Sequence, residues 1–473
     1  MDFFNKLIRS NSIKKKPASD QESTDEKSSE KKKEFWKFLQ LEEENVKCVS
    51  VIIVGAGSRG FVYTFYAMNF PKRMKLVGVV DPRAAAREKI KKYHEVDEDK
   101  YFEDWREAVE REKFADAVII TTPDKLHKDP AIAFAKKGYH ILLEKPMAVT
   151  PEDCKEIVST CKENGVMLAV GHVLRYHPVS VQIKELIDSG IIGDIVHIQH
   201  MEPVGFWHFA HSYVRGNWRN EAESTFSLLA KSCHDIDLIS YWMGKQRCIK
   251  VSSFGSLSHF TKENKPSGAG SRCLDCAVEE GCPYSAQKIY LNKGHFGWPV
   301  EVVCSNGVYD IESLTEALKT GPYGRCVYEC DNDVCTNQVV NMEFEGGKTA
   351  AFTMMGFTYA LGVRSTTIYG TKGELRNRGK SHITVYKFLT NEEVTYPARQ
   401  NAFIPPYLGG HSGADYYLID AFISAVANND PSRIVTGPED TLRSHLLVFH
   451  AEKSRRENRV VNIDSEEAEL PEP

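Results

Sequence analysis

The sequence predicts an α/β protein of two domains. The first is a Rossmann domain with a doubly wound parallel sheet, and the second is an α+β domain with a large, open and mostly antiparallel sheet. Three observations support this prediction. A buried strand runs into a glycine-rich turn at VSVIIVGAGSRG (49–60). Apolar runs and helical segments then alternate regularly to about residue 171, as in a parallel sheet. After that point the pattern changes to the one-sided alternation of antiparallel strands.

Length and composition indicate a globular protein. The chain has 473 residues, too many for one ordinary core, so we expect two domains. Its 42% hydrophobic and 26% charged residues are typical of soluble proteins. The net charge of −5 gives no support for nucleic-acid binding. No apolar run reaches the roughly 20 residues that span a bilayer, and the N-terminus lacks a secretory core. We therefore expect a cytoplasmic protein without a membrane span or a nucleic-acid partner.

The sequence predicts that both terminal segments of the chain lie outside the folded domains. Residues 1–46 contain runs of charge among Ser, Asp and Gln and little apolar surface to bury, which is typical of disorder. The first ten residues, MDFFNKLIRS, can alternatively form a short amphipathic helix that touches a membrane surface or a partner. Residues 466–473 are acidic and flanked by proline, so we expect them to fray.

The glycine-rich turn predicts a dinucleotide site. Gly55, Gly57 and Gly60 follow the first strand with G-x-G-x-x-G spacing. Such glycines allow a tight turn, a close approach to a pyrophosphate and close packing of the next helix. That helix begins near Ser58 and presents free N–H groups to the phosphates. Asp81 ends the next apolar run, 21 residues after Gly60, where a carboxylate accepts ribose hydroxyls. A structural glycine turn is the alternative that this combination disfavours.

The carboxyl ends of the predicted strands carry the other cofactor candidates. We expect strands at 51–54, 76–80, 117–120, 140–143 and 167–170, with helices between them at 83–92, 105–110 and 130–137 and from 151. Ligands of doubly wound sheets bind beyond these strand ends. A carboxylate at position 81 favours NAD, whereas two nearby arginines keep NADP as an alternative. The candidates are Arg59, Arg83, Thr122, Pro123, His127, Glu144, Lys145 and Arg175.

The second domain extends over 172–465. We expect its strands at 194–201, 250–254, 338–345, 349–357, 365–369 and 383–387, and its helices at 178–189, 232–243, 414–427 and 440–455. A cysteine-rich insertion occupies about 260–335.

Several motifs resemble the glucose–fructose oxidoreductase/inositol dehydrogenase (Gfo/Idh/MocA) family. They are GAGSRG (55–60), VVDPR (79–83), TTPDKLH (121–127), LLEKPMA (142–148), GHVLRYHP (171–178) and CHDIDL (233–238). The resemblance covers about 48–465 and implies a Rossmann domain, a second domain whose open sheet forms homo-oligomers (dimers or tetramers), and NAD(P)-dependent chemistry on sugars and polyols. A subset of the family with a C-L-D-C…C-P-Y-S-A insertion is more similar still.

The resemblance has one gap. The family commonly places an Asp four residues before the histidine of its second motif, which corresponds to His234 here. That position is Ala230 in this chain, and Lys231 follows it. The departure puts the usual proton relay in doubt and leaves Lys145 and His234 as the predicted catalytic pair.

The predicted pair can move a proton. Hydride leaves a carbinol carbon only if the hydroxyl proton also leaves, so the site needs a base near that oxygen. The resemblance places Lys145 beside the nicotinamide ring, and His234 is the natural second base or orienting group. The structural alternatives are a surface lysine at a strand end and a histidine that caps a helix or lies in the core.

A stretch rich in aromatic residues, FWHFAHSYVRGNW (206–218), predicts the substrate side. Aromatic faces with a few directed donors suit the CH faces and hydroxyl fringe of a sugar ring. A packed interdomain or oligomer loop is an equal alternative. The candidates are His208, Tyr213, Arg215, Trp218 and Lys231. His411 and Asp415 either serve the same cleft or cap the next helix.

Five cysteines form a second constellation. Cys273, Cys276 and Cys282, with Cys326 or Cys330, have the pattern of a closed zinc site that fixes the insertion. An iron–sulfur cluster fits the usual cysteine runs less well. Reduced cysteines without a metal are the third interpretation.

The sequence therefore predicts an NAD(P)-dependent dehydrogenase or reductase for a sugar, polyol or related cyclic alcohol. A redox-neutral glycosidase or lyase that oxidises its substrate only transiently is the first alternative. A dinucleotide-binding regulator without turnover is the second.

Overall fold

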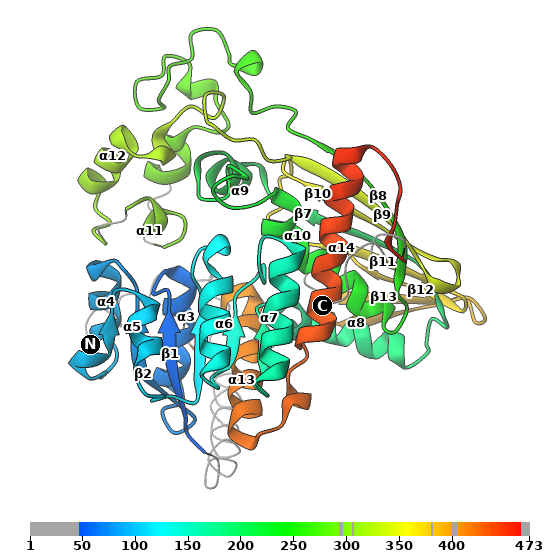
Figure 1. Cartoon of the computed structure of the whole chain (residues 1–473). Coiled ribbons are helices and arrows are strands. Elements are labelled where there is room, and N and C mark those ends of the chain that lie inside the picture. Colours follow the sequence, from blue (N-terminus) through cyan, green and yellow to red (C-terminus); the bar gives the residue numbers. More distant parts are fainter. Residues whose placement is uncertain are drawn as a thin grey trace, which may run out of the picture. The chain divides into compact units, whose positions relative to one another are not determined.

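The computed structural model describes residues 47–292, 297–304, 307–379, 382–399, 404–405 and 407–464 (Figure 1). The predicted tails, 1–46 and 466–473, lie outside the described residues. From Cys48 onward the described residues form one compact unit. Among the described helices, none is long and apolar enough to cross a membrane.

The first sheet has six parallel strands in the order β3-β2-β1-β4-β5-β6, which confirms the predicted Rossmann fold. The strands are β1 (Val49–Val54), β2 (Met74–Val80), β3 (Tyr101–Phe102), β4 (Ala117–Ile120), β5 (His140–Leu143) and β6 (Leu168–Val170). The intervening helices are α3 (Ser58–Asn69), α4 (Ala84–Lys91), α5 (Trp105–Glu110), α6 (Lys128–Lys136) and α7 (Pro151–Glu163). The central strands β1 and β4 are apolar except for Ser50, as expected where helices cover both faces of a sheet.

Local sequence signals set several helix ends. The side chain of Thr150 caps α7 by accepting the N–H of Asp153 at 3.1 Å, and Pro151 takes the first helical position. Asp104 caps α5 in a reciprocal arrangement with Glu107. Strand β3 was missed because two residues carry no periodic pattern.

The strand order reverses between β1 and β4, so a crevice opens there beyond the carboxyl ends of the strands. The glycine turn follows β1, and the 121–127 loop follows β4. The switch point therefore brings together the first two groups of predicted cofactor residues.

The second sheet has nine strands in the order β14-β13-β12-β11-β7-β10-β9-β8-β15. Its neighbours pair antiparallel except β7 and β10, so the prediction of a mostly antiparallel sheet is confirmed. The strands are β7 (Ile195–Pro203), β8 (Cys248–Ser256), β9 (Asn337–Phe344), β10 (Lys348–Met355), β11 (Ser365–Gly370), β12 (Gly373–Asn377), β13 (His382–Lys387), β14 (Glu392–Pro397) and β15 (Val461–Asn462).

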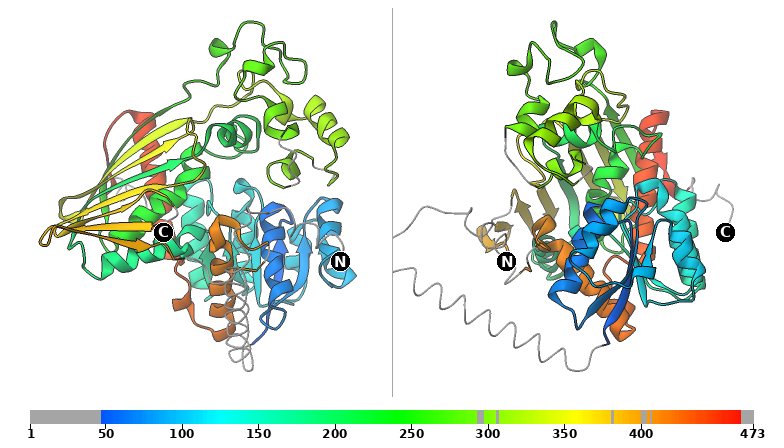
Figure 2. Two further views of the ribbon diagram at one scale, coloured as in Figure 1. Left: turned by 180° about the vertical axis from the view of Figure 1, so that it is seen from behind. Right: turned by 90° about the vertical axis from the view of Figure 1, so that its left-hand side faces the viewer.

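Four helices connect the two sheets. Helix α8 (Pro178–Asp188) and helix α10 (Ser227–Met243) follow the Rossmann strands, and α10 packs on β7 and β10. Helix α14 (Pro438–Glu457) packs on β8 and α10 and also on α7, while α13 (Ala414–Asn428) packs on α3 and β1 (Figures 1 and 2). The last two helices therefore return to the first sheet. The boundary predicted at residue 172 stays a prediction.

The cysteine-rich insertion has a small core of its own. Helices α11 (Val300–Val303) and α12 (Ile311–Thr320) pack with buried residues that include Ile289, Tyr290 and Leu318. In Figure 1 these helices lie beside α9 (Phe206–Phe209), the start of the predicted substrate segment.

Candidate active site

The glycine turn is tightly packed at two of its three glycines and open at the third. Gly55 has φ +93°, and a Cβ on Gly60 would lie 2.0 Å from the carbonyl oxygen of Gly55, so both positions need glycine for internal reasons. A Cβ on Gly57 would meet nothing closer than 3.6 Å, where a nitrogen of Arg83 lies. The space above Gly57 and the first turn of α3, beginning at Ser58, is therefore open to a ligand.

Asp81 lies at the end of β2 and is tied to the turn. Its carboxylate accepts the N–H of Ala56 at 2.8 Å and two guanidinium N–H groups of Arg83 at 2.8 and 2.9 Å. Burial raises the pKa of Asp81, but the hydrogen bonds from Arg83 outweigh it and lower the pKa overall. Arg83 is mostly exposed and covers a carboxylate that is 3% exposed. A ribose hydroxyl reaches Asp81 only when Arg83 moves.

Arg59 joins the turn to two distant elements. Its Nε donates to Glu144 at 2.7 Å, and its terminal nitrogens donate to both oxygens of Asp415 at 2.9 and 3.0 Å. The hydroxyl of Tyr63 accepts from Arg59 and donates to Glu144 at 2.8 Å. Burial raises the pKa of Glu144, but Arg59 and then Lys145 lower it by more, so the carboxylate stays ionised. This network fixes the strand end that carries Lys145.

The Lys145 amine reaches the second domain. Its Nζ donates to the carbonyl oxygen of Ala230 at 2.6 Å, in the first turn of α10. The side chain of Lys231 lies 3.2 Å from Glu202 of β7, and Arg364 lies 3.2 Å from the other oxygen of that carboxylate. Burial lowers the pKa of Lys231, and Glu202 partly restores it. Lys145 thus contacts the backbone at the position without the expected Asp, and the next residue, Lys231, is paired with a buried carboxylate.

His234 is buried close to Lys145. Its ring lies 5.5 Å from the ring of His172 and 6.3 Å from that of His411. Burial, and then the charge of Lys145, lower the pKa of His234 well below its usual value, so the ring is neutral. Among the described residues, nothing hydrogen-bonds its Nδ1. A neutral imidazole with a free, buried nitrogen is suited to accept a proton or hydrogen bond from a ligand.

His411 and Asp415 border this cluster. The Nδ1 of His411 lies 3.0 Å from Asp415, which is buried and also holds Arg59. Burial raises the pKa of Asp415, but Arg59 and His411 lower it well below its ordinary value. The pair therefore links the glycine turn to α13 and to the surroundings of His234.

Other candidates of the cofactor side hold backbone segments together. The ring nitrogens of His127 lie 2.7 Å from the carbonyl oxygen of Pro146 and 2.8 Å from that of Thr122, and the side chain is 1% exposed. The hydroxyl of Thr122 donates to the carbonyl of Leu126. His127 thus fixes the 121–127 loop, including Pro123, against the segment after Lys145.

The comparisons with known proteins agree with this geometry. The family described as "Oxidoreductase family, NAD-binding Rossmann fold" (Gfo/Idh/MocA) matches residues 49–172. The description "Oxidoreductase family, C-terminal alpha/beta domain" matches residues 184–463, which is more than half of the chain. The chain belongs to the Gfo/Idh/MocA oxidoreductase family. Membership of a subset with a cysteine-rich insertion stays a prediction.

Two curated relatives indicate the range of this family. Scyllo-inositol 2-dehydrogenase (NAD⁺) of Bacillus subtilis is 29% identical over 46% of this chain and 58% of the relative. The 2,7-anhydro-N-acetylneuraminate hydratase of Escherichia coli is 29% identical over 46% of this chain and 57% of the relative. The chain thus spans little more than half of each. Scyllo-inositol dehydrogenase of Lactobacillus casei, solved with NAD(H) and scyllo-inositol, matches in fold with a TM-score of 0.59 at 20% identity, covering 88% of this chain and 100% of that one.

Within this Gfo/Idh/MocA frame, Arg175 lies in an unexpected place. Its guanidinium is 3% exposed and forms two 2.7 Å hydrogen bonds to Asp237, and a third N–H donates to the carbonyl of Val435 at 3.0 Å. These contacts join the segment after β6 to α10 and to the chain before α14. The geometry gives no support to the prediction that Arg175 binds the cofactor.

The predicted substrate segment divides into two parts. His208 lies near Lys231, whose charge adds to burial in lowering the pKa of His208, and its ring packs 5.0 Å from Trp298 of the insertion. Tyr213 is buried, and the centre of its ring lies 6.3 Å from that of His208. Trp218 instead donates its indole N–H to Asp124 at 3.0 Å, so it holds the 121–127 loop.

Arg215 turns away to the cysteines. It is fully buried and contacts the carbonyls of Arg325 and Tyr284 and the thiol of Cys273. The structure therefore separates Arg215 from the lysines and histidines with which the sequence grouped it. Among the described residues, no three His, Cys, Asp or Glu side chains are close enough to hold one metal ion, and all twelve cysteines are free. The predicted zinc site gains no support from this geometry.

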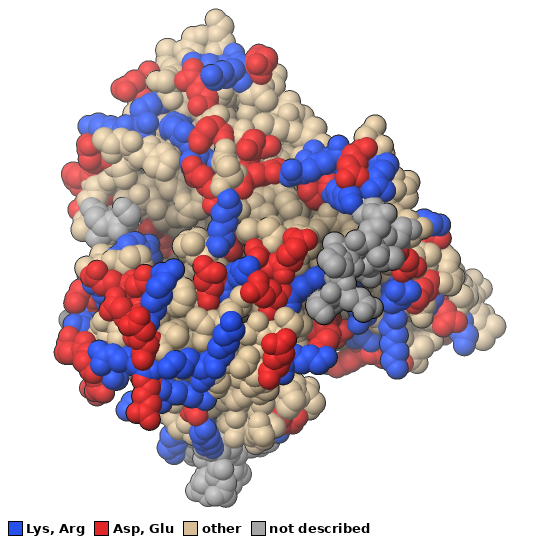
Figure 3. All heavy atoms as spheres, viewed as in Figure 1, with Lys and Arg blue, Asp and Glu red and all other residues tan. Residues whose placement is uncertain are grey.

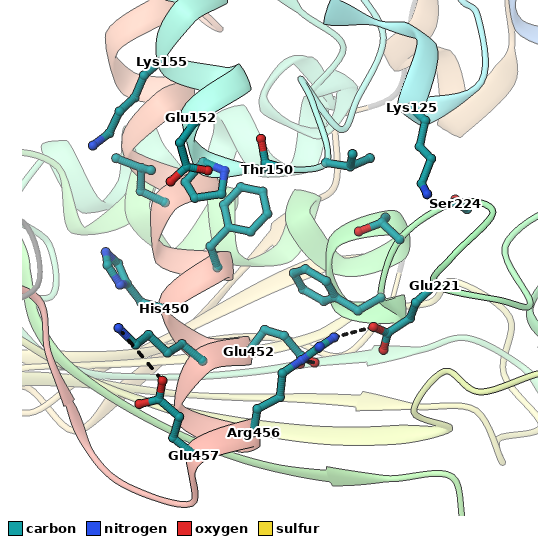
Figure 4. A pocket seen from close by; sticks show the side chains of 17 residues that line it. Lys125, Thr150, Glu152, Lys155, Glu221, Ser224, His450, Glu452, Arg456 and Glu457 are labelled. Carbon is teal, nitrogen blue, oxygen red and sulfur yellow. Dashed lines mark hydrogen bonds and ion pairs between the residues drawn. The ribbon is translucent and has the colours of Figure 1, made fainter. Parts of the chain in front are cut away.

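A further hollow on the surface lies apart from this site. Lysines and arginines are interspersed with acidic residues on the face in Figure 3. A hollow of about 600 Å³ lies between the start of α7, helix α14 and the 221–226 loop (Figure 4). In it, Arg456 forms an ion pair with Glu221. None of the predicted cofactor, catalytic or substrate residues lines it.

Sequence reasoning missed four residues of the site. Tyr63, Glu202, Arg364 and Trp298 come from separate elements and belong to no motif. Only Glu202 could have been found from the sequence. It lies on the face of β7 that packs against a helix, and glutamate is rarely buried on such a face unless it is paired.

Proposed function

We propose that this Gfo/Idh/MocA chain is an NAD-dependent oxidoreductase that transfers a hydride between the nicotinamide ring and a carbinol carbon of a polyol or sugar. The observation that carries this proposal is the pairing of Lys145 with His234. The amine comes from the switch-point edge of the Rossmann sheet, and the neutral imidazole with its free Nδ1 comes from α10 of the second domain.

The turn fits a dinucleotide. Gly57 leaves an open cradle, α3 begins directly beneath it, and Asp81 stands where an adenosine ribose would lie. The N–H groups at Gly57 and Ser58 would hold the pyrophosphate. Arg83 would have to turn from Asp81 for NAD, and the same side chain could pair with a 2′-phosphate. We propose NAD because the buried carboxylate opposes that phosphate.

Two residues of the site have separate roles in the proton transfer. When bound, NAD⁺ supplies the ring that accepts the hydride. His234 is neutral, and its free nitrogen can take the hydroxyl proton as the carbonyl forms. Lys145 can exchange its hydrogen bond to the Ala230 carbonyl for one to the substrate oxygen, where its charge stabilises developing negative charge. We assign both as catalytic residues on this basis.

The neighbouring ion pair compensates for Ala230. Glu202 is fully buried and lies 3.2 Å from the amine of Lys231, the residue after Ala230. We propose that Lys231 donates a hydrogen bond to a second substrate hydroxyl. The rings of His208, Tyr213 and Trp298 offer faces to the CH side of the substrate.

A polyol assay tests this function. Purified protein is incubated with NAD⁺ and a panel of inositols, aldoses and sugar acids, and NADH is followed. We expect at least one substrate to reduce NAD⁺. In the variant Lys145→Met the rate should fall by roughly 10²- to 10⁴-fold, while Lys136→Met, an exposed lysine on α6, should leave it unchanged. Equal rates in both variants would exclude the proposed role of Lys145.

A redox-neutral reaction with transient oxidation is the second candidate. Two observations favour it: Ala230 replaces the acid that the family resemblance leads us to expect, and the E. coli relative is named a hydratase. Product formed without net NADH, with deuterium from D₂O incorporated beside the transient carbonyl, would select it over the dehydrogenase.

We also propose a cytosolic homo-oligomer. The face of the second sheet opposite α10 exposes Phe254 and Tyr369, at 62% and 40%, among threonines and short polar residues. Such a face suits self-association. Light scattering of the wild type and of Phe254→Glu tests this: a dimer or tetramer that the substitution dissociates is the expected result.

A further inference from the structure

Four cysteines of the insertion converge on one cavity. Cys273, Cys276, Cys282 and Cys326 line a space of about 330 Å³, although the last is distant from the other three in the sequence. Cys330, the other candidate, does not line it and instead donates its thiol to the carbonyl of Cys326 at 3.3 Å. The structure thus chooses between the two cysteines that the sequence left as alternatives.

A buried cation with a free donor lines the same cavity. Arg215 is fully buried, and its Nη2 donates to the sulfur of Cys273 at 3.3 Å and to the carbonyl of Tyr284 at 2.9 Å. Among the described residues, its Nη1 has no hydrogen-bond partner. The N–H of Gly270 also donates to the sulfur of Cys276 at 3.4 Å. Burial raises the pKa of the Tyr290 hydroxyl, and the guanidinium of Arg215 lies close enough to lower it in part. No ion pair with a carboxylate compensates the buried charge of Arg215 among the described residues, so an anionic group at the cavity would be stabilised.

The size of the cavity, about 330 Å³, favours a group larger than one ion. Zinc requires four sulfurs at about 2.3 Å from a single point. No such grouping exists among the described cysteines, and the four thiols surround a cavity instead. A polynuclear cluster separates its cysteines by its own width. The Cys273-x₂-Cys276 pair and a proline directly after Cys282 also occur in cluster-binding runs, although the five residues between Cys276 and Cys282 depart from the usual spacing.

The surrounding chain needs such a cross-link. Between the end of β8 and the turn η7 (Gln287–Leu291) the described chain has only two single-turn helices, η5 (Lys262–Asn264) and η6 (Glu279–Gly281). Cys273 belongs to the small core of the insertion, but Cys276 and Cys282 lie outside it. A segment with so little regular structure is typically held by a metal centre or by disulfides.

We propose that this cavity binds a [4Fe–4S] cluster through the thiolates of Cys273, Cys276, Cys282 and Cys326. Ligation releases the thiol protons, and the four thiolates leave the ligated cluster with a net negative charge that Arg215 partly offsets. The cluster anchors the turn η4 (Ala210–Arg215), which follows directly on the helix that carries His208. It therefore fixes one wall of the candidate active site without taking part in hydride transfer.

Metal and sulfide analysis of the full chain tests the proposal. The protein is purified without oxygen, and iron, inorganic sulfide and zinc are measured before and after reconstitution with ferrous iron and sulfide. We expect about four iron ions and four sulfides per chain, with a visible absorption that dithionite bleaches. One zinc ion per chain without iron, or no bound metal after reconstitution, would overturn the proposal.

A matched pair of variants locates the cluster. Cys326→Ser should lose most of the iron and the visible absorption, whereas Cys330→Ser, four residues further along the chain, should retain both. Equal iron content in the two variants would contradict the assigned ligand set. If Cys326→Ser does not fold, the metal content of the wild type and of Cys330→Ser still decides whether a cluster is bound without Cys330.

Discussion

The glycine turn and the 206–218 segment behave very differently. In the turn, the three glycines lie between β1 and α3 in the tight conformation that the motif predicts, because neighbours within a few residues determine the backbone. In the 206–218 segment, His208 faces the candidate site, Trp218 holds the 121–127 loop, and Arg215 belongs to the cysteine cavity. A composition rich in aromatic residues and arginine identifies a functional region but does not assign the roles within it.

The two regions also differ in what supports them. The turn depends on the space left by its glycines. At Gly55 and Gly60 a Cβ would collide with the protein itself, whereas at Gly57 the missing Cβ leaves room for a ligand. The segment depends on partners from distant parts of the chain, such as Asp124 and Arg325. Substitutions in the turn should therefore separate folding from binding, whereas substitutions in the segment should change stability first.

The largest effect is expected at Arg175, which a motif assigned to the cofactor. Arg175→Met leaves the buried carboxylate of Asp237 without its cation, which should lower the free energy of unfolding by about 3–5 kcal/mol. The affinity of the folded variant for NAD⁺ should not change. Urea denaturation and a fluorescence titration with NADH measure the two quantities, and a variant of normal stability that fails to bind NADH would show that the motif was right.

The next effect contrasts two glycines of one turn. Gly60→Ala forces a Cβ to within 2.0 Å of a carbonyl oxygen and should cost about 3 kcal/mol or more of stability. Gly57→Ala meets nothing closer than 3.6 Å, so its unfolding temperature should stay near that of the wild type while NAD⁺ binding weakens. Similar melting curves for the two variants would remove the distinction between folding and binding positions.

Acid should destabilise the protein in a range set by buried histidines. Burial lowers the pKa of His172 and His211 to about 3 and that of His445 to about 4. In the unfolded chain these histidines bind protons near pH 6.5, so below that pH the unfolded state holds more protons and the folded state loses stability. The loss is about 1.4 kcal/mol per pH unit for each histidine. Urea denaturation at pH 7.5 and pH 5.5 measures it, and equal stabilities would contradict the neutral histidines.

The smallest effect is expected in the 206–218 segment. Trp218→Phe keeps the ring and removes the N–H that Asp124 accepts, which should cost about 1 kcal/mol. Because Ser224 also donates to Asp124 at 2.8 Å, Ser224→Ala is the matched comparison. If Trp218→Phe changes substrate affinity without changing the melting temperature, Trp218 belongs to the substrate side as the sequence predicted.

Much of the fold could be predicted because its signals are local. Buried parallel strands read as continuous apolar runs, and the cap at Thr150 is visible in four residues. Strands β12, β14 and β15 were missed because they are short or exposed at the sheet edge, where little apolar alternation is needed. The Glu202–Lys231 pair and the meeting of Arg215 with the cysteines depend on contacts between distant segments, which one sequence does not reveal.

The central claim is that one nicotinamide dinucleotide site spans the glycine turn and the strand end that carries Lys145. The most direct measurement is a crystal structure of the wild-type chain with NAD⁺. We expect the pyrophosphate on the N–H groups above Gly57, a ribose hydroxyl on Asp81, and the Nζ of Lys145 beside the reactive carbon of the ring. A dinucleotide bound elsewhere, or a ring remote from both Lys145 and His234, would contradict it.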